Sequence, residues 1–300
     1  MKPDTRSTPL RLTIRFVLTA SQCLAIAACE PRGRISAERA FADVERIASL
    51  IASDVAEIER GLPAGATKLG EILAKENVAL RPGEPAIRSA LRKMRERTVD
   101  LGIAKSTFFA LASDQGIALR NDFDQDSIAG LDLLAAWPAL VPVTKGAPYA
   151  SATGQLSPPT PPSPADREWV AAVPVAKHDG SKAGLLVTGW TYRRFAYHLQ
   201  VSLERETRER YEREKNGKKV PILYVCLFDK ENVYCAKMPG APAVPEVNER
   251  TLATLNLHAR TSTAPASSPI TIESREFGWA AARAPRLSAE VGFVILRSEL

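Results

Sequence analysis

Apolar residues in the first third of the chain recur at helical spacing. Between Val44 and Ile58 they stand three or four positions apart, which predicts an amphipathic helix. Ser36 is a suitable N-cap for this helix, and the run Gly61-Leu-Pro63 predicts its end. Two shorter helices are expected to follow, over residues 66–76 and 84–99. Residues 36–100 should therefore be mainly helical.

Beyond residue 105 the apolar pattern becomes that of β-hairpins. Three hairpins are predicted over residues 107–120, 169–190 and 222–236, and further strands over 270–283 and 291–297. Gly116 gives the first hairpin a turn residue that can take positive φ. The strands are separated by expected helices at 192–215 and 246–257, by a proline-rich connection around 154–164, and by a loop at 261–269. N-terminal helices followed by an antiparallel sheet with interspersed helices define an α+β fold for residues 36–300, hairpin-rich over 105–300.

The N-terminal segment has the charge pattern of a secretory signal. Four basic residues and one acidic residue precede an uncharged stretch of 13 residues, Phe16–Ala28. A helix needs roughly 20 apolar residues to span a bilayer. We therefore expect residues 1–28 to be a removable signal peptide and not a permanent transmembrane anchor.

The signal closes with Ile26-Ala-Ala-Cys29, which resembles the lipobox of bacterial lipoproteins. The resemblance implies that the Cys29 thiol receives a diacylglycerol and that cleavage before it exposes an amine that is usually acylated. Residues 29–35 would then tether the protein to a membrane of the cell envelope, at the periplasmic side or the cell surface. The alternative is an ordinary signal peptide in which Cys29 is an incidental thiol.

The charge and the motif content exclude several functions. The formal charge is +6 for the whole chain, and loss of the signal's four bases and one acid lowers it to about +3, so nucleic acid is not an expected partner. The three histidines, at 178, 198 and 258, lack metal-ligand spacing, and no nucleophile elbow, phosphate loop or zinc-protease motif is present. Neither an enzyme nor a cofactor is expected.

Two cysteines of the mature chain stand on opposite strands of a predicted hairpin. If the turn at 229–232 is symmetric, Cys226 lies directly opposite Cys235. Directly opposed residues of an antiparallel pair have Cα atoms roughly 4.5–5.5 Å apart, which is within disulfide reach. An oxidising compartment would favour this disulfide. The alternative is a pair of small apolar thiols on one face of the hairpin.

Two further segments could bind something. Asp122, Asp124 and Asp126 alternate and could converge on Ca²⁺, although the residues that follow depart from an EF-hand and a solvated acidic turn is the alternative. The second segment combines aromatic residues with two arginines where a strand gives way to a helix, a place suited to an anion. Its possible ligand-binding residues are Trp190, Tyr192, Arg193, Arg194 and Tyr197. The alternative is that the aromatics belong to the core and the arginines extend into solvent.

Short motifs of the first two hairpins resemble the Cache group of extracellular sensor domains. They are the run Phe108–Asp122, the strand Trp169–Lys177, the turn His178-Asp-Gly180 and the strand Ala183–Gly189. The resemblance spans about residues 36–300. It implies a PAS-like fold, with a long N-terminal helix beside antiparallel hairpins and a small-molecule pocket between the sheet and the loops over it. The ligand-binding pattern of some Cache domains is not located here, so no ligand residue is carried over from the family.

These observations lead to two functional hypotheses. The first is a lipid-anchored sensor that binds a small molecule and signals through an envelope protein, because no segment after the signal could cross a membrane. The second is a structural or assembly lipoprotein that binds another envelope protein without a small ligand. An enclosed pocket with ligand-dependent stabilisation would distinguish the first from the second.

Overall fold

The computed structural model describes residues 32–105, 108–156, 166–177, 180–214, 219–236 and 244–299. The predicted signal peptide, Cys29 and His178 lie outside these residues. Within them, no helix combines the length and the hydrophobicity that a membrane crossing requires.

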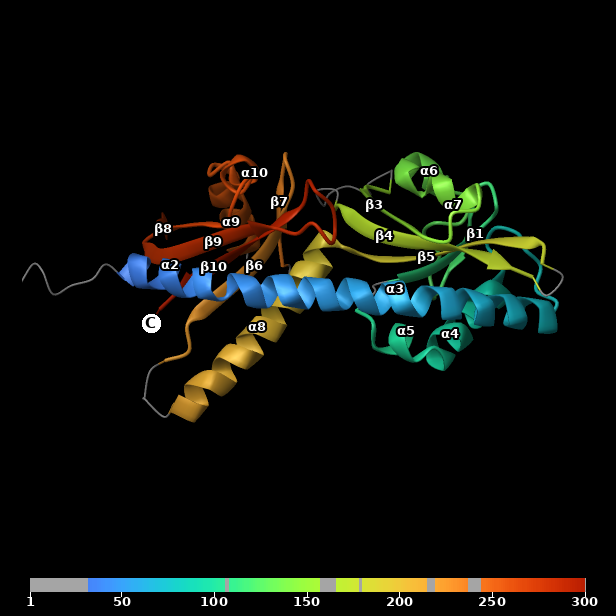
Figure 1. The fold of residues 1–300 in the computed structure, drawn as a ribbon, viewed down its shortest axis with the longest axis horizontal. Helices are drawn as coiled ribbons and strands as arrows, with labels where there is room; N and C mark the ends of the chain where they lie inside the picture. Colours follow the sequence, from blue (N-terminus) through green and yellow to red (C-terminus); the bar gives the residue numbers. More distant parts are fainter. Residues whose placement is uncertain are drawn as a thin grey trace, which may run out of the picture.

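The strands form two antiparallel five-stranded sheets with the same internal order (Figure 1). The first sheet contains β1 (Phe108–Ala112), β2 (Ala118–Asn121), β3 (Ala150–Gly154), β4 (Glu168–Ala176) and β5 (Lys182–Thr191). The second contains β6 (Ile222–Phe228), β7 (Val233–Cys235), β8 (Ala266–Ile272), β9 (Arg275–Arg283) and β10 (Gly292–Ser298). Their orders are β2-β1-β5-β4-β3 and β7-β6-β10-β9-β8. Each sheet therefore arranges its strands as second, first, fifth, fourth and third.

Helices lie on both sides of the two sheets (Figure 1). One side carries α2 (Arg32–Ala42), α3 (Val44–Lys75), α4 (Pro85–Arg97), α5 (Val99–Ile103) and α8 (Tyr192–Glu214). The other side, here called the outer face of each sheet, carries short helices. They are α6 (Leu133–Ala136), η1 (Pro138–Leu140) and α7 (Val141–Thr144) over the first sheet, and α9 (Val244–Ala253) and α10 (Leu257–Arg260) over the second. The α+β fold class is confirmed.

The N-terminal helices are longer than the sequence pattern predicts. Residues 33–36, expected as tether and cap, are already helical, and the Ser36 hydroxyl accepts a bond from the Glu299 backbone N–H. The predicted end at Gly61 and the separate helix at 66–76 are wrong, because α3 continues through Pro63 to Lys75. The apolar stripe continues past the proline, and Gly61 and Gly65 let Leu101 approach so closely that a Cβ would lie 2.7 and 2.5 Å from it. Tertiary packing thus overrides the local stop signal.

Two strands occur where loops are expected. The connection between the first two predicted hairpins contains β3, and residues 266–269 of the loop predicted at 261–269 belong to β8, which includes Pro269. Both are edge strands, and an edge strand tolerates proline because one side of its backbone needs no partner. The single strand expected over 270–283 is a β8–β9 hairpin, in which Glu273 takes φ 55°.

One apolar core joins the helices to the inner faces of both sheets. It includes Ile51 and Ile58 of α3, Val173 of β4 and Ile295 of β10, all at most 1% exposed. The outer face of each sheet has a separate cluster of its own. The organisation of residues 36–300 as one domain stays a prediction, while the structure shows two sheets on a shared helical layer.

Candidate functional site: a pocket on the outer face of the first sheet

A pocket of about 290 Å³ lies on the outer face of the first sheet, under its cover of short helices and loops. The strands contribute side chains from the same end of the sheet, where β5 passes into α8. The lining residues are Phe108, Asn121, Phe123, Ser127, Ile128, Leu133, Trp137, Leu156, Glu168, Thr191 and Arg194. The pocket is therefore mainly apolar and aromatic, with a few polar groups, as small-molecule sites generally are.

Strand alternation determines which residues reach this pocket. Glu168 of β4 lies directly opposite Thr191 of β5, and both point to the outer face. Their neighbours Trp169 and Trp190 are also paired, but they point to the opposite, helical side. There Trp190 is fully buried between Trp169 and Phe195, with ring centroids 4.5 and 4.2 Å away.

Two buried polar atoms of pocket-lining residues have no hydrogen-bond partner among the described residues. They are the indole Nε1 of Trp137, a side chain only 1% exposed, and the carboxylate oxygen Oε2 of Glu168. Burying an unpaired polar group costs about 1–3 kcal/mol. Both atoms are buried, and they belong to residues that line the same pocket.

Burial and a neighbouring charge change the acidity of Glu168. Desolvation, together with the nearby Asp166 carboxylate, raises its pKa from 4.5 to about 7, although a backbone hydrogen bond from Leu156 acts in the opposite direction. No cation among the described residues forms an ion pair with Glu168. Residues 106–107 and 157–165, which adjoin the pocket in sequence but lie outside the described part, carry no ionisable side chain.

The five residues predicted at the strand-to-helix junction separate into different environments. Arg194, in the first turn of α8, is exposed and lines the pocket. Trp190 and Tyr197 pack with the shared core, and Tyr192 packs edge-on against Tyr234 of β7 at 5.2 Å. Arg193 points toward the second sheet. The structure thus brings one of the five, Arg194, to the pocket.

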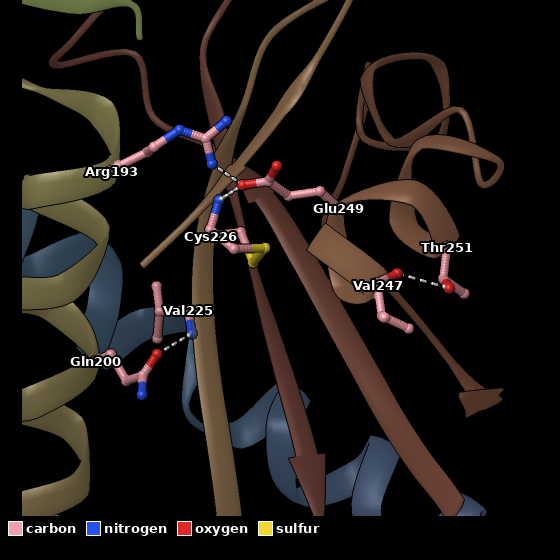
Figure 2. The surroundings of a disulfide bond; sticks show 8 residues. Arg193, Gln200, Val225, Cys226, Val247, Glu249 and Thr251 are labelled. Carbon is pink, nitrogen blue, oxygen red and sulfur yellow. Dashed lines mark hydrogen bonds and ion pairs between the residues drawn. A yellow bond between two sulfur atoms is a disulfide. The ribbon is translucent and has the colours of Figure 1, made fainter. Parts of the chain in front are cut away.

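Arg193 connects the start of α8 to the disulfide hairpin (Figure 2). Its guanidinium forms an ion pair with Glu249 of α9, and the same carboxylate oxygen accepts the backbone N–H of Cys235 at 2.8 Å. Cys226 and Cys235 are register partners joined by a disulfide, so the predicted bridge is confirmed. The first turn of α8 therefore contacts the pocket through Arg194 and the second sheet through Arg193.

A second polar contact joins the two sheets nearby. Arg167, next to pocket residue Glu168, forms an ion pair with Asp229 at 3.2 Å in the turn between β6 and β7. Asp229 also accepts the hydroxyl proton of Tyr234 at 3.1 Å. Two residues that line the pocket, Glu168 and Arg194, are thus each adjacent in sequence to an arginine that contacts the second sheet or its helix α9.

The three aspartates considered for Ca²⁺ do not converge. Asp122 is buried and accepts the Phe109 backbone N–H, Asp124 forms ion pairs with two arginines of α4, and Asp126 pairs with Arg120. No group of three or more metal-ligating side chains occurs in the described ranges. Each of the three carboxylates thus has its own protein partners in the segment at the end of β2.

Three solved structures illustrate what this chain resembles. The extracellular domain of vpHK1S-Z8, assigned as a histidine kinase, has a TM-score of 0.50 at 9% identity, with 90% of this chain and 97% of that chain covered. A methyl-accepting chemotaxis protein X has a TM-score of 0.48 at 14% identity, covering 88% and 97%. The fold is Cache-like.

A third similar structure is an extracellular ligand-binding receptor from Desulfohalobium retbaense, with a TM-score of 0.42 at 11% identity. The match covers 85% of this chain but spans only 39% of the length of that receptor. No family model matches the sequence, and no curated protein matches it. At these identities the comparisons establish the fold alone.

The pocket residues Glu168, Trp137 and Asn121 were not identified from the sequence. The available signal was the parity of the second hairpin, since Trp190 and Thr191 must face opposite sides of the sheet. A long apolar strand such as β5, buried on both faces over most of its length, does not show which of its alternating residues face the pocket.

Proposed function

We propose that this protein is an extracytoplasmic sensor that binds a small molecule in the pocket on the outer face of the first sheet. The observation that carries the proposal is the pocket itself, which combines apolar walls with the unpaired groups of Trp137 and Glu168. A bound molecule that satisfies these groups would offset the free-energy cost of burying them.

The same proposal gives α8 the role of transmitting occupancy to the second sheet. A ligand that fills the pocket beside Arg194 would shift the first turn of α8, and the Arg193–Glu249 pair would carry that shift to α9 and the disulfide hairpin. With lipid at Cys29 as the anchor, as the lipobox resemblance implies, the signal would pass to a partner protein of the cell envelope. No catalytic step is part of this proposal.

Ligand binding is tested by a thermal-shift screen of the purified protein against small acids, amines, sugars, nucleosides and divalent cations. A hit at a hundredfold excess over its Kd should stabilise the protein by about 2.7 kcal/mol. The Leu156→Trp variant, which fills the pocket, should lose this shift. Leu255→Trp is the matched control, because Leu255 is a partly buried leucine over the outer face of the second sheet. Equal loss in both variants, or no hit in the panel, would favour the scaffold hypothesis.

Transmission is tested by hydrogen exchange with the ligand identified in that screen. Binding should change exchange in α9 and β7 of the wild type. The Arg193→Ala variant should bind with similar affinity but show no change in α9, while loss of binding in that variant would contradict a purely transmitting role. Anchoring is tested separately, since Cys29→Ala should release the protein from membranes.

A further inference from the structure

The charge distribution inside the pocket is one-sided. Glu168 and Arg194 are the charged residues in its lining, and they differ in position. Arg194 is exposed at the rim and has no ion-pair partner among the described residues, whereas the Oε2 atom of Glu168 is buried. A carboxylate of the wall is therefore the charge that a bound molecule meets in the interior.

The other ionisable groups near Glu168 cannot serve as its counter-ion. Asp166, on the same segment, has the same sign and accepts the backbone N–H of Arg193. Arg167, the adjacent residue, is paired with Asp229 at the junction with the second sheet. On the β2 side, Asp126 and Arg120 are paired with each other, and the lining residues from β1, β2, η1 and the β3 end are uncharged.

We propose that the pocket takes an organic cation, a protonated amine on an apolar body, and that Glu168 is its counter-ion. This inference rests on the proposed function and adds the chemical class of the ligand. The ammonium would pair with the carboxylate of Glu168, which has no ion-pair partner among the described residues, in a pocket whose lining includes the aromatic side chains of Trp137 and Phe108, a kind of ring whose face attracts cations. The apolar body would pack on Ile128, Leu133 and Leu156.

Binding of such a cation should release the proton that Glu168 holds. Without a bound cation, Glu168 is about half protonated at neutral pH, because burial raises its pKa to about 7. A bound ammonium favours the ionised carboxylate, so the proton that Glu168 held leaves to solvent. The affinity for the cation must then fall as the pH falls below about 7. A sensor of this kind reports a cation more strongly in neutral than in acidic surroundings.

The test uses three probes that share a 2-phenylethyl group and differ in charge: 2-phenylethylamine, 2-phenylethanol and 3-phenylpropionate. Titration calorimetry at pH 8 should show the amine binding most tightly and the anion least. From pH 8 to pH 6 the amine affinity of the wild type should fall about tenfold, because a group with pKa about 7 changes from mostly ionised to mostly protonated. At pH 7, two buffers of different ionisation heat should reveal release of about half a proton per amine.

Two variants complete the test. Glu168→Gln keeps the shape of the side chain and should bind the amine weakly and without pH dependence. Glu57→Gln is the matched control, because Glu57 on α3 is also a carboxylate with a buried unpaired oxygen and a pKa raised by burial, but it lies on the helical side of the sheet. Its amine affinity and pH profile should equal those of the wild type.

The outcomes separate this inference from the proposed function. If the alcohol or the anion binds best, and Leu156→Trp abolishes that binding, the sensor proposal stands and the cation inference is overturned. An amine affinity that Glu168→Gln leaves unchanged overturns it equally. If none of the three probes binds and the broad panel also gives no hit, both proposals fail.

Discussion

The two sheets share one strand order but use their outer faces differently. Over the first sheet, the cover of α6, η1 and α7 leaves a pocket of about 290 Å³ with unpaired polar groups. Over the second, α9 and α10 lie on a cluster that contains the disulfide, Trp279 and Phe277. Two sheets with one strand order thus differ in what lies over them: the cover of the first leaves a pocket, and the cover of the second packs on an apolar cluster.

The largest expected effect comes from removing a large side chain from the apolar cluster on the outer face of the second sheet. Trp279 is 1% exposed, and Trp279→Ala should lower the free energy of unfolding by about 3–5 kcal/mol, through lost burial and a cavity. Trp137→Ala over the first sheet should cost less, because one side of Trp137 already borders the pocket. Urea denaturation of both variants measures the difference. If Trp137→Ala lowers the free energy of unfolding as much as Trp279→Ala or more, the side chains over the first sheet are packed as tightly as those over the second.

Removing the disulfide should have the next largest effect. The bond closes a loop of sequence separation 9, for which the chain-entropy relation gives about 2–3 kcal/mol. The double variant Cys226→Ala, Cys235→Ala should lose this stability and keep ligand affinity at the first sheet. Denaturation under non-reducing conditions measures the loss, with reduced wild type as the control. A variant that also loses ligand binding would argue that the two faces are not independent.

The division between the faces was only partly visible in the sequence. The cysteine hairpin was predictable because a symmetric turn fixes which residues oppose each other, and Cys226 and Cys235 are indeed register partners. The strand-to-helix junction at Trp190 was also correctly located. Which of its residues line the pocket was not predictable, because the alternation of side chains along β5 shows this only once the cover over one face of the sheet is known.

Longer-range packing explains the remaining differences. Pro63 is a local stop signal, yet α3 passes through it because glycines on the helix accept Leu101. The edge strands β3 and β8 are short of apolar residues, and pairing with a neighbouring strand forms them where propensity does not. The duplication of the sheet has no counterpart in the sequence as a repeat, since only strand order and not residue identity is shared.

The buried carboxylate of Glu168 should lower the stability of the protein to an extent that depends on pH. The pKa of Glu168 is raised in the folded protein from 4.5 to about 7, so folding favours its protonated form. The wild type should therefore lose stability as the pH rises from about 4.5 through about 7. Glu168→Gln lacks this loss and should be more stable than the wild type at pH 8 by roughly 1–3 kcal/mol, with no advantage at pH 4. Urea midpoints across this range measure it, and an unchanged profile would contradict a buried, uncompensated carboxylate.

The smallest effect should come from the cover of the pocket. Asp132 is the N-cap of α6, where one carboxylate oxygen accepts the backbone N–H groups of Leu134 and Ala135 at 2.9 and 3.0 Å. Asp132→Ala should cost about 1 kcal/mol of stability. Because α6 carries Leu133 and leads into Trp137, the loosened cover should also weaken ligand binding, whereas Asn256→Ala, at the start of α10 over the second sheet, should leave it unchanged. Calorimetric titration of both variants measures this, and equal affinities would mean that the strands alone hold the ligand, so that the difference between the two faces would lie in the sheets after all.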